Sequence, residues 1–267
     1  MNYNLIKTDI EVLSDIDLNN TTKYYRFKET DFFFKKHDNT DRLVVSFHGS
    51  RETTKGIYAP LPIFRGFDWD FNMLCISDKL LNIVDVNVSH IGWFLSPNGS
   101  GFHETYVDII SFFLDKFQNI VFTGTSAGGF PALLYSSYFK KKGIISNTQL
   151  YLNNAWPANM VNNMEINLNK QFEIKTCEDI ITKFGCPKKF IYYTNENDIF
   201  CYKKHFCPFN EYLTKNNYNT HFDMRNFIGK ETAYPHAVQI PAGTTYHDEI
   251  EKLLNFNPIC ESVPPQE

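Results

Sequence analysis

The chain has 267 residues, and its 26 Lys and Arg stand against 30 Asp and Glu, a formal net charge of −4. This balance excludes a strongly basic nucleic-acid-binding protein, because such proteins need a positive field to attract phosphates. Hydrophobic residues make up 43% and charged residues 21%, as in ordinary globular proteins and unlike disordered or collagen-like chains.

The cysteines and the apolar runs indicate a cellular compartment. No C-x-x-C pair and no histidine at zinc-finger spacing occurs, so we expect free thiols and no metal site at Cys75, Cys177, Cys186, Cys201, Cys207 and Cys260. Residues 1–14 lack the apolar stretch of a secretory signal, and no run approaches the roughly 18 apolar residues of a membrane span. We therefore expect a cytoplasmic protein without a transmembrane segment. The oligomeric state stays open.

No repeat or Pro/Gly-rich linker divides the sequence, so we expect one domain over 1–267, with a core of about 24–255 and a flexible tail around Pro264 and Pro265. Short β-rich runs alternate with helical patterns, which is typical of a mostly parallel sheet covered by helices on both faces. We predict eight strands, at 24–27, 32–36, 43–47, 72–76, 120–123, 149–153, 190–193 and 221–226. The first two form a hairpin that precedes the parallel part.

Helical spacing is clearest in 102–117, where the apolar residues fall three, four or one apart and form one stripe. Further helices are expected after residue 129 through Tyr138, around 177–184 and near 246–254. The segment 159–171 is interpreted as a less regular insertion between strands.

The motif Gly124-Thr125-Ser126-Ala127-Gly128 lies between a predicted strand and a predicted helix. The pattern Gly-x-Ser-x-Gly puts a serine on a sharp turn, with its hydroxyl projecting from the sheet edge. We expect both glycines to face neighbouring backbone so closely that a Cβ would clash. A helix-capping turn is the structural alternative, and a phosphate loop is disfavoured because no Gly-Lys-Ser/Thr follows. The order of strand, serine and helix favours Ser126 as a nucleophile.

A serine nucleophile needs a base, usually histidine, which a carboxylate orients. The chain order expected for this elbow, serine, acid and then histidine, is met by Ser126, Asp198 and a later histidine. Asp198 follows the strand at 190–193, at the carboxyl edge where ligand sites of open α/β sheets collect. Glu196 is a less favoured substitute, and a simple turn residue is the structural alternative for Asp198.

Two histidines compete for the role of base. His236 lies in a loop between the last strand and the final helix, where the base is expected. His247 follows threonines that can cap the final helix, so a first-turn residue is its structural alternative. We predict His236 as the base and keep His247 as the alternative. His205 and His221 are expected to be structural or surface residues.

Acyl transfer also needs N–H donors for an oxyanion. One amide is expected from the residue after the nucleophile, Ala127, and the second from Ser50, because Gly49 lets the chain turn after the third strand. Gly49 and Arg51 are candidate substrate-binding residues, with Arg51 either binding an anionic substrate or facing water. His48 is expected to pack rather than to catalyse.

On the elbow Gly124 to Gly128, the His48-Gly49 turn, Asp198 and a late histidine, the chain resembles the α/β-hydrolase superfamily across roughly 24–255. The resemblance implies the α/β-hydrolase fold, with an eight-stranded sheet, and serine-dependent ester chemistry, but not a substrate. A narrower resemblance is to bacterial capsule or surface-glycan O-acetyltransferases and their esterase relatives, in which the serine is acetylated and a sugar hydroxyl replaces water. The sequence contains no large helical cap insert of the kind that would predict a lipid or bulky hydrophobic substrate.

We therefore hypothesise a serine enzyme that forms an acyl-Ser126 intermediate and passes the acyl group to water or to a carbohydrate hydroxyl. The expected substrate is a small-molecule or glycan ester, and no bound cofactor is expected, although acetyl-CoA is a candidate acyl donor for a transferase. The alternative is a catalytically inactive glycan-binding module that uses residues such as Trp93, Asn98 and Trp156. A peptidase has no support beyond the shared triad.

Overall fold

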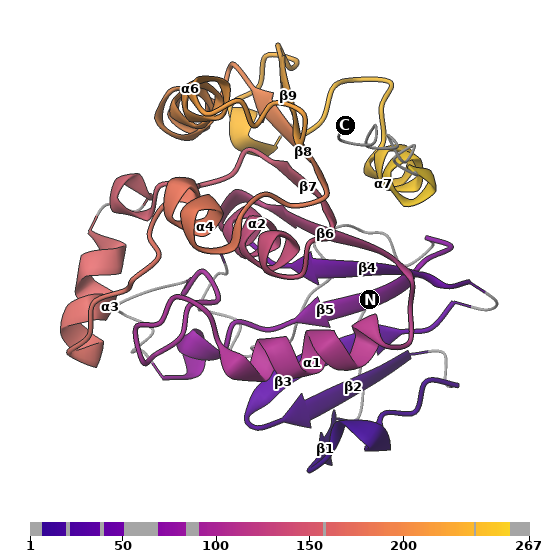
Figure 1. Ribbon diagram of the computed structural model, residues 1–267. Helices are drawn as coiled ribbons and strands as arrows, with labels where there is room; N and C mark the ends of the chain where they lie inside the picture. Colours follow the sequence, from indigo (N-terminus) through magenta and orange to yellow (C-terminus); the bar gives the residue numbers. More distant parts are fainter. Residues whose placement is uncertain are drawn as a thin grey trace, which may run out of the picture.

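A nine-stranded sheet forms the centre of the part of the chain that the structure describes (Figure 1). The computed structural model describes residues 7–19, 22–37, 40–50, 69–83, 91–156, 159–237 and 239–256. The strands are Lys7–Ile10 (β1), Thr22–Phe27 (β2), Thr30–Lys35 (β3), Arg42–Phe47 (β4), Asn72–Ile76 (β5), Asn119–Thr125 (β6), Lys142–Ser146 (β7), Lys189–Asn195 (β8) and Phe222–Phe227 (β9).

The strands lie in the order β1-β2-β3-β5-β4-β6-β7-β8-β9. Neighbouring strands run parallel except where β3 meets β2 and β5. The antiparallel β2–β3 pair is the predicted hairpin. The predicted mostly parallel sheet is therefore confirmed. Arg51, Cys260 and the expected tail around Pro264 and Pro265 lie outside the described residues.

The sheet corrects the expectation of eight strands in two places. The short edge strand β1, which pairs with β2, was not predicted because its sequence Lys-Thr-Asp-Ile holds one large apolar residue. The strand predicted at 149–153 is wrong, because that segment is loop and a 3₁₀ turn at Leu152–Asn154, while the strand is β7. Strand β7 was not predicted because it begins at the end of a run of lysines, which lacks the apolar pattern of a buried strand. At Lys140 the backbone is left-handed (φ 54°), and the chain enters β7 two residues later.

Seven α-helices accompany the sheet within the described ranges: Glu104–Leu114 (α1), Gly129–Tyr138 (α2), Met160–Leu168 (α3), Cys177–Phe184 (α4), Ile199–Cys201 (α5), Cys207–Lys215 (α6) and Tyr246–Asn255 (α7). A π-helical segment, Tyr202–Phe206, joins α5 to α6. The helices expected within 102–117, after 129, at 177–184 and at 246–254 are confirmed. None of the helices in the described ranges has the length and apolar character needed to cross a bilayer.

Helix α3 lies where we expected a less regular insertion. Its sequence is rich in asparagine, which lowers helix propensity. Burial of Met160, Val161 and Met164 on one face stabilises it instead. Asn159 and Asn169 at its two ends both have left-handed backbone, which asparagine tolerates better than other non-glycine residues.

Helices cover both faces of the sheet (Figure 1). Apolar side chains of α1, α2, α4 and α6 join the larger core on one face. Helix α7 packs on the other face, against strand residues that include Val44 and Val121. The next residues along these strands, Val45 and Phe122, belong to the larger core. Strands buried on both faces appear in a sequence as continuous apolar runs, which is why β4 could be predicted.

Helix α1 begins at a buried histidine. The Nδ1 atom of His103 accepts a hydrogen bond from the Thr105 amide at 3.2 Å and so caps the helix. Burial lowers the pKa of His103 to about 4. Because an unfolded histidine has a pKa near 6.5, the unfolded chain binds more protons between about pH 4 and pH 6.5. Stability therefore falls as the pH drops through this window.

The substitution His103→Asn tests this linkage, since asparagine keeps the capping function and has no titratable group. We expect the loss of unfolding free energy between pH 7 and pH 5 to be smaller in the variant by about 1–2 kcal/mol. Urea denaturation at the two pH values measures this. An unchanged pH dependence would show that His103 titrates alike in both states.

Candidate active site

The centre of the sheet contains a topological switch point. From β4 the chain moves to β5 on one side and later to β6 on the other, so the direction of the strand order reverses between β4 and β6. In open α/β sheets, ligands bind outside the carboxyl ends of the strands at such a point. Gly49 follows β4 and Ser126 follows β6, so both residues lie at this position.

Ser126 has a left-handed backbone, with φ 54°, and opens a 3₁₀ turn at Ser126–Gly128 that leads from β6 into α2. This conformation costs a non-glycine residue about 1–2 kcal/mol, and such strain clusters at functional sites. Among residues 124–128, Ser126 alone is not buried. The strained turn therefore presents the serine at the surface while its neighbours pack.

The glycines of the elbow are required by close packing. A Cβ on Gly124 would overlap the backbone of Gly128, and a Cβ on Gly128 would overlap the carbonyl groups of Phe47 and His48. Both contacts are with backbone, which cannot turn aside as a flexible side chain can. The expected close approach at both glycines is therefore confirmed.

The turn after β4 reaches the serine. A Cβ placed on Gly49 would lie 3.5 Å from the Cβ of Ser126 and 3.3 Å from the Thr125 carbonyl oxygen. Ser50, the next residue, is exposed, and Ala127, which follows the serine in the chain, is buried. The two residues expected to supply oxyanion donors thus belong to the two turns that meet at the switch point.

His48 holds this turn in place through hydrogen bonds. Its buried ring donates from Nδ1 to the Gly49 carbonyl at 2.7 Å and accepts at Nε2 from the Asp78 amide at 3.1 Å. The Asp78 carboxylate accepts hydrogen bonds from the amides of Leu80, Gly92 and Phe94. His48 therefore has a structural contact on each ring nitrogen, as its expected packing role requires.

Asp198 and His236 form a direct pair. Asp198 lies beyond β8 and caps α5, and its Oδ2 atom lies 2.6 Å from His236 Nδ1. Because an ionised carboxylate only accepts hydrogen bonds, Nδ1 carries the proton and donates it. In a neutral ring with this tautomer the lone pair is on Nε2, which is the arrangement that a general base needs.

The electrostatics of Asp198 balance two opposing effects. Burial by itself raises the pKa of the Asp198 carboxyl, but the hydrogen bonds from His236 and from the Cys201 amide outweigh it and lower that pKa overall. Asp198 is therefore ionised at neutral pH. Its side chain is 8% exposed, whereas that of His236 is 44% exposed, so the imidazole connects a buried charge to the surface.

Two buried asparagines hold the loop that carries His236, and the sequence did not reveal them. The Asn147 side-chain amide donates to the His236 carbonyl at 3.1 Å, and that of Asn195 donates to the Pro235 carbonyl at 3.0 Å. Asn195 also accepts from the Gly229 amide. Their positions, one directly after β7 and one at the end of β8, were the only signal available.

The same segment after β7 also contacts the serine turn. The Gln149 amide donates to the Ser126 carbonyl at 3.2 Å, two residues after Asn147 binds the His236 carbonyl. Strands β6, β7, β8 and β9 are consecutive and parallel. The structure thus gathers Ser126, Asp198 and the His236 loop at one sheet edge.

His247 lies in a different environment. Its Nε2 atom pairs with Asp70 at 2.7 Å, and its ring stacks on Phe71 with centroids 4.8 Å apart. These two partners precede β5, so they lie at the amino end of that strand. His247 is therefore engaged at the edge opposite to the serine turn, in the first turn of α7, which Thr245 caps.

The remaining candidates separate into buried and surface residues. His205 is fully buried, its Nδ1 accepts from the Tyr151 amide, and burial lowers its pKa to about 4. His221 precedes β9 and contacts the Pro187 carbonyl. Glu196 contacts the Asn226 side chain on β9 rather than His236.

Two of the three residues proposed for a glycan-binding module are accessible. Asn98 is exposed and Trp156 is 67% exposed. Trp93 is fully buried, which corrects its expected role as a surface contact for sugars. The aromatic-rich sequence places this side chain in the core.

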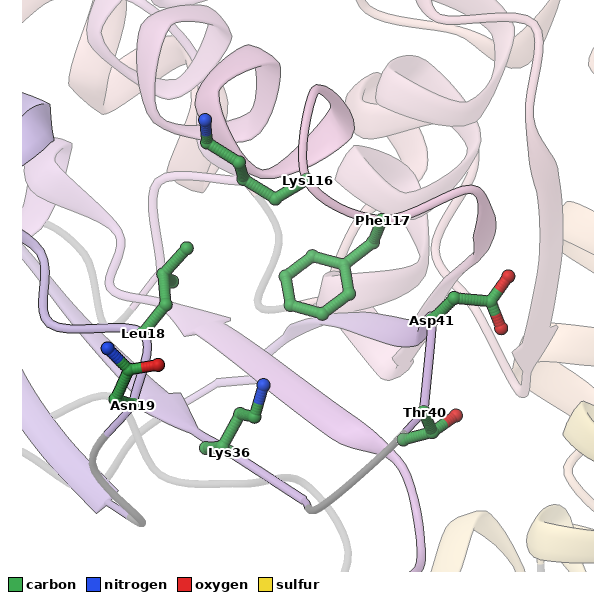
Figure 2. Close-up of a pocket in the computed structure, with 7 residues that line it drawn as sticks. All are labelled: Leu18, Asn19, Lys36, Thr40, Asp41, Lys116 and Phe117. Atoms are coloured by element: carbon green, nitrogen blue, oxygen red, sulfur yellow. The ribbon is translucent and has the colours of Figure 1, made fainter.

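A hollow of about 620 Å³ has its lining residues labelled in Figure 2. It is lined by Leu18, Asn19, Lys36, Thr40, Asp41, Lys116 and Phe117. Asp41 precedes β4 and Phe117 precedes β6, so the hollow is at the amino ends of the central strands. It is therefore separate from the candidate active site.

Comparison with known proteins yields structural neighbours only. No family model and no curated protein matches the sequence. The capsule O-acetyltransferase of Neisseria meningitidis serogroup A has a TM-score of 0.54 at 14% identity, over 91% of this chain and 99% of that one.

Two further solved structures give similar values. FphF, a fluorophosphonate-binding serine hydrolase of Staphylococcus aureus, has a TM-score of 0.53 at 12% identity, covering 88% of this chain and 98% of its own. An esterase of the bacterial hormone-sensitive lipase family has 0.51 at 11%, covering 90% and 85%. At these identities the likeness establishes the fold alone.

Packing at the elbow gives a stability prediction with a matched control. Gly128 has an ordinary φ of −68°, so Gly128→Ala is harmful only through overlap with backbone, whereas Gly243 has φ +82° and no described atom near its Cβ position. We expect Gly128→Ala to lower the unfolding free energy by about 3 kcal/mol or more, and Gly243→Ala by about 1 kcal/mol. Urea denaturation compares the two, and the reverse order would contradict the packing argument.

Proposed function

We propose that this chain, which has the α/β-hydrolase fold, catalyses serine-dependent acyl transfer. Ser126 is the nucleophile, His236 the general base and Asp198 the carboxylate that orients the imidazole. The observation that carries the proposal is the 2.6 Å contact between His236 and Asp198 at the sheet edge of the strained Ser126 turn. A neutral imidazole with its Nε2 lone pair available is the partner that a serine hydroxyl needs.

In the first half-reaction, Ser126 Oγ attacks the carbonyl carbon of an ester while its proton passes to His236 Nε2. The carbonyl π electrons move to oxygen, and the amides of Ser50 and Ala127 donate to the resulting oxyanion. The tetrahedral intermediate then collapses, the bond to the leaving group breaks, and His236 returns the proton to that group. An acyl-Ser126 ester is left.

In the second half-reaction, His236 takes a proton from an acceptor hydroxyl, which attacks the acyl-Ser126 carbonyl. Release of Ser126 Oγ with this proton restores the enzyme. Ionised Asp198 stabilises the imidazolium in both halves. Helix α2 begins at Gly129, and its N-terminal amides face the serine turn, which favours negative charge there.

The acceptor separates an esterase from an O-acetyltransferase, and the surroundings of Ser126 favour a carbohydrate. Trp156 is 67% exposed. The side-chain amide of Gln149 donates to the Trp156 carbonyl at 3.2 Å and accepts from the Trp156 backbone amide at 3.3 Å. The backbone N–H of Gln149 donates a hydrogen bond to the Ser126 carbonyl. Gln149 thus links the Trp156 backbone to the serine turn, and an exposed indole face suits the apolar face of a sugar ring. We infer a glycan ester or a glycan acceptor, with acetyl-CoA as the candidate donor for transfer.

Covalent labelling tests the chemistry. We expect a fluorophosphonate probe to form an adduct on Ser126 and none in Ser126→Ala, detected by mass spectrometry. The variant His236→Ala should lower the kcat for p-nitrophenyl acetate by about 10³-fold or more, whereas His247→Ala, the matched control, stays within about threefold of the parent.

If His247→Ala abolishes turnover while His236→Ala spares it, the base assignment is wrong. A folded parent protein that forms no adduct on Ser126 would instead favour the catalytically inactive glycan-binding module.

The Trp156→Ala variant tests the acceptor. We expect it to raise the KM for a glycan acceptor about tenfold or more through lost stacking, while turnover of p-nitrophenyl acetate without acceptor stays unchanged. Acetylated glycan formed from acetyl-CoA, measured by mass spectrometry, identifies transfer. Rapid release of p-nitrophenol that glycan leaves unaffected identifies an esterase, and an equal loss of both activities would show that Trp156 serves the fold.

A further inference from the structure

Behind His236, one cluster of potential metal ligands is found in the described parts of the chain. It consists of Asp198, Cys201 and His236, whose ligand atoms all lie within 4.8 Å of one another. The Cys201 sulfur is 3.7 Å from His236 Nδ1, the atom that contacts Asp198 Oδ2 at 2.6 Å. The proposed acyl transfer uses the carboxylate and the imidazole but has no step for the thiol.

We propose that Asp198, Cys201 and His236 bind a thiophilic divalent cation such as Zn²⁺, and that the bound cation switches off acyl transfer. The inhibitory effect rests on the function proposed above, but the cation site itself does not. Carboxylate, thiolate and imidazole are the ligand types that Zn²⁺ takes in proteins.

The three ligand atoms, which lie within 4.8 Å of one another, need to rearrange by about 1 Å. Tetrahedral Zn²⁺, with bonds of about 2.0–2.3 Å, separates its ligand atoms by roughly 3.3–3.8 Å. The distance between Cys201 and His236 already falls in this range, whereas Asp198 and His236 must separate by about 1 Å. The shift falls on the His236 side chain, which is 44% exposed, while Asn147 still holds the His236 carbonyl.

The two other ligands are held in place by the fold. Asp198 and Cys201 are three residues apart on one helical turn, and Asp198 Oδ1 accepts from the Cys201 amide at 3.2 Å. The Cys201 thiol points to the Asn147 carbonyl, with the sulfur 3.3 Å from the oxygen. Both side chains are buried, so the cation would approach from the His236 side.

Binding balances in charge and in protons. The cation replaces the thiol proton of Cys201, which leaves as H⁺, and the thiolate and the Asp198 carboxylate together offset its two positive charges. At His236 the cation takes the Nδ1 lone pair, and the Nδ1 proton moves to Nε2. The imidazole stays neutral, but Nε2 is now an N–H group without a lone pair and no longer accepts the proton of Ser126.

The site is tested with Cd²⁺ as a spectroscopic probe, since cadmium thiolates absorb in the near ultraviolet. The parent for this experiment carries Cys186→Ser and Cys207→Ser, because these half-buried thiols are the accessible ones among the described cysteines. We expect one equivalent of Cd²⁺ to produce the thiolate band in this parent and no band after Cys201→Ser, whose hydroxyl retains a donor for the Asn147 carbonyl. His236→Ala should weaken Cd²⁺ binding at least tenfold.

Activity supplies the second measurement. Zn²⁺ should inhibit p-nitrophenyl acetate turnover in the parent and EDTA should restore it, while Cys201→Ser should need at least tenfold more Zn²⁺ for half-inhibition. A band that persists in Cys201→Ser, or equal inhibition of both proteins, overturns the proposal. If Cys201→Ser does not fold, Cys201→Ala and the His236→Ala titration decide in the same way.

The two proposals fail separately. A band that depends on Cys201 in a protein that neither labels at Ser126 nor turns over ester supports the cation site and contradicts the proposed function. Labelling and turnover without any such band support the function and contradict the cation site.

Discussion

The close approach of three backbone segments at the elbow determines how the site is built. Gly128 packs against the carbonyls of Phe47 and His48, so the start of α2 contacts the end of β4. Next to that contact Ser126 has a left-handed backbone, and Gly49 lies beside it. Any side chain at Gly128 would separate the segments, and the serine would lose both its exposed position and the neighbouring turn.

Around this contact, each functional group comes from a different strand. The serine follows β6, the carboxylate follows β8, and the imidazole lies beyond β9. Parallel neighbours end at one edge, so short loops suffice to bring the groups together. The pKa of the Asp198 carboxyl is lowered, because hydrogen bonds to the buried carboxylate outweigh the effect of its burial.

The sequence predicted those features whose cause is local. Strands such as β4 appear as apolar runs because both sheet faces are covered, and the elbow glycines are necessary wherever a serine turn packs on backbone. Strand β7 was missed because it begins with a lysine that follows further lysines, and helix α3 was missed because it is rich in asparagine. Packing with distant residues stabilises both elements.

The supports of the site were beyond prediction for a related reason. Asn147 and Asn195 bind backbone carbonyls 89 and 40 residues further along the chain, and carbonyls carry no sequence signal. The grouping of Cys201 with Asp198 and His236 likewise depends on a loop 35 residues away from the thiol. His236 could be selected over His247 from its place in the chain order, but its contact with Asp198 required the fold.

The use of asparagine for the His236 loop has a consequence for proton transfer. A side-chain amide neither gains nor loses a proton near neutral pH, and both loop anchors attach to main-chain oxygens rather than to the imidazole. The two asparagines therefore hold the loop in the same way whether the imidazole is cationic or neutral. In the proposed acyl transfer the ring gains and loses a proton twice in each cycle, and neither asparagine anchor contacts the atoms that change charge.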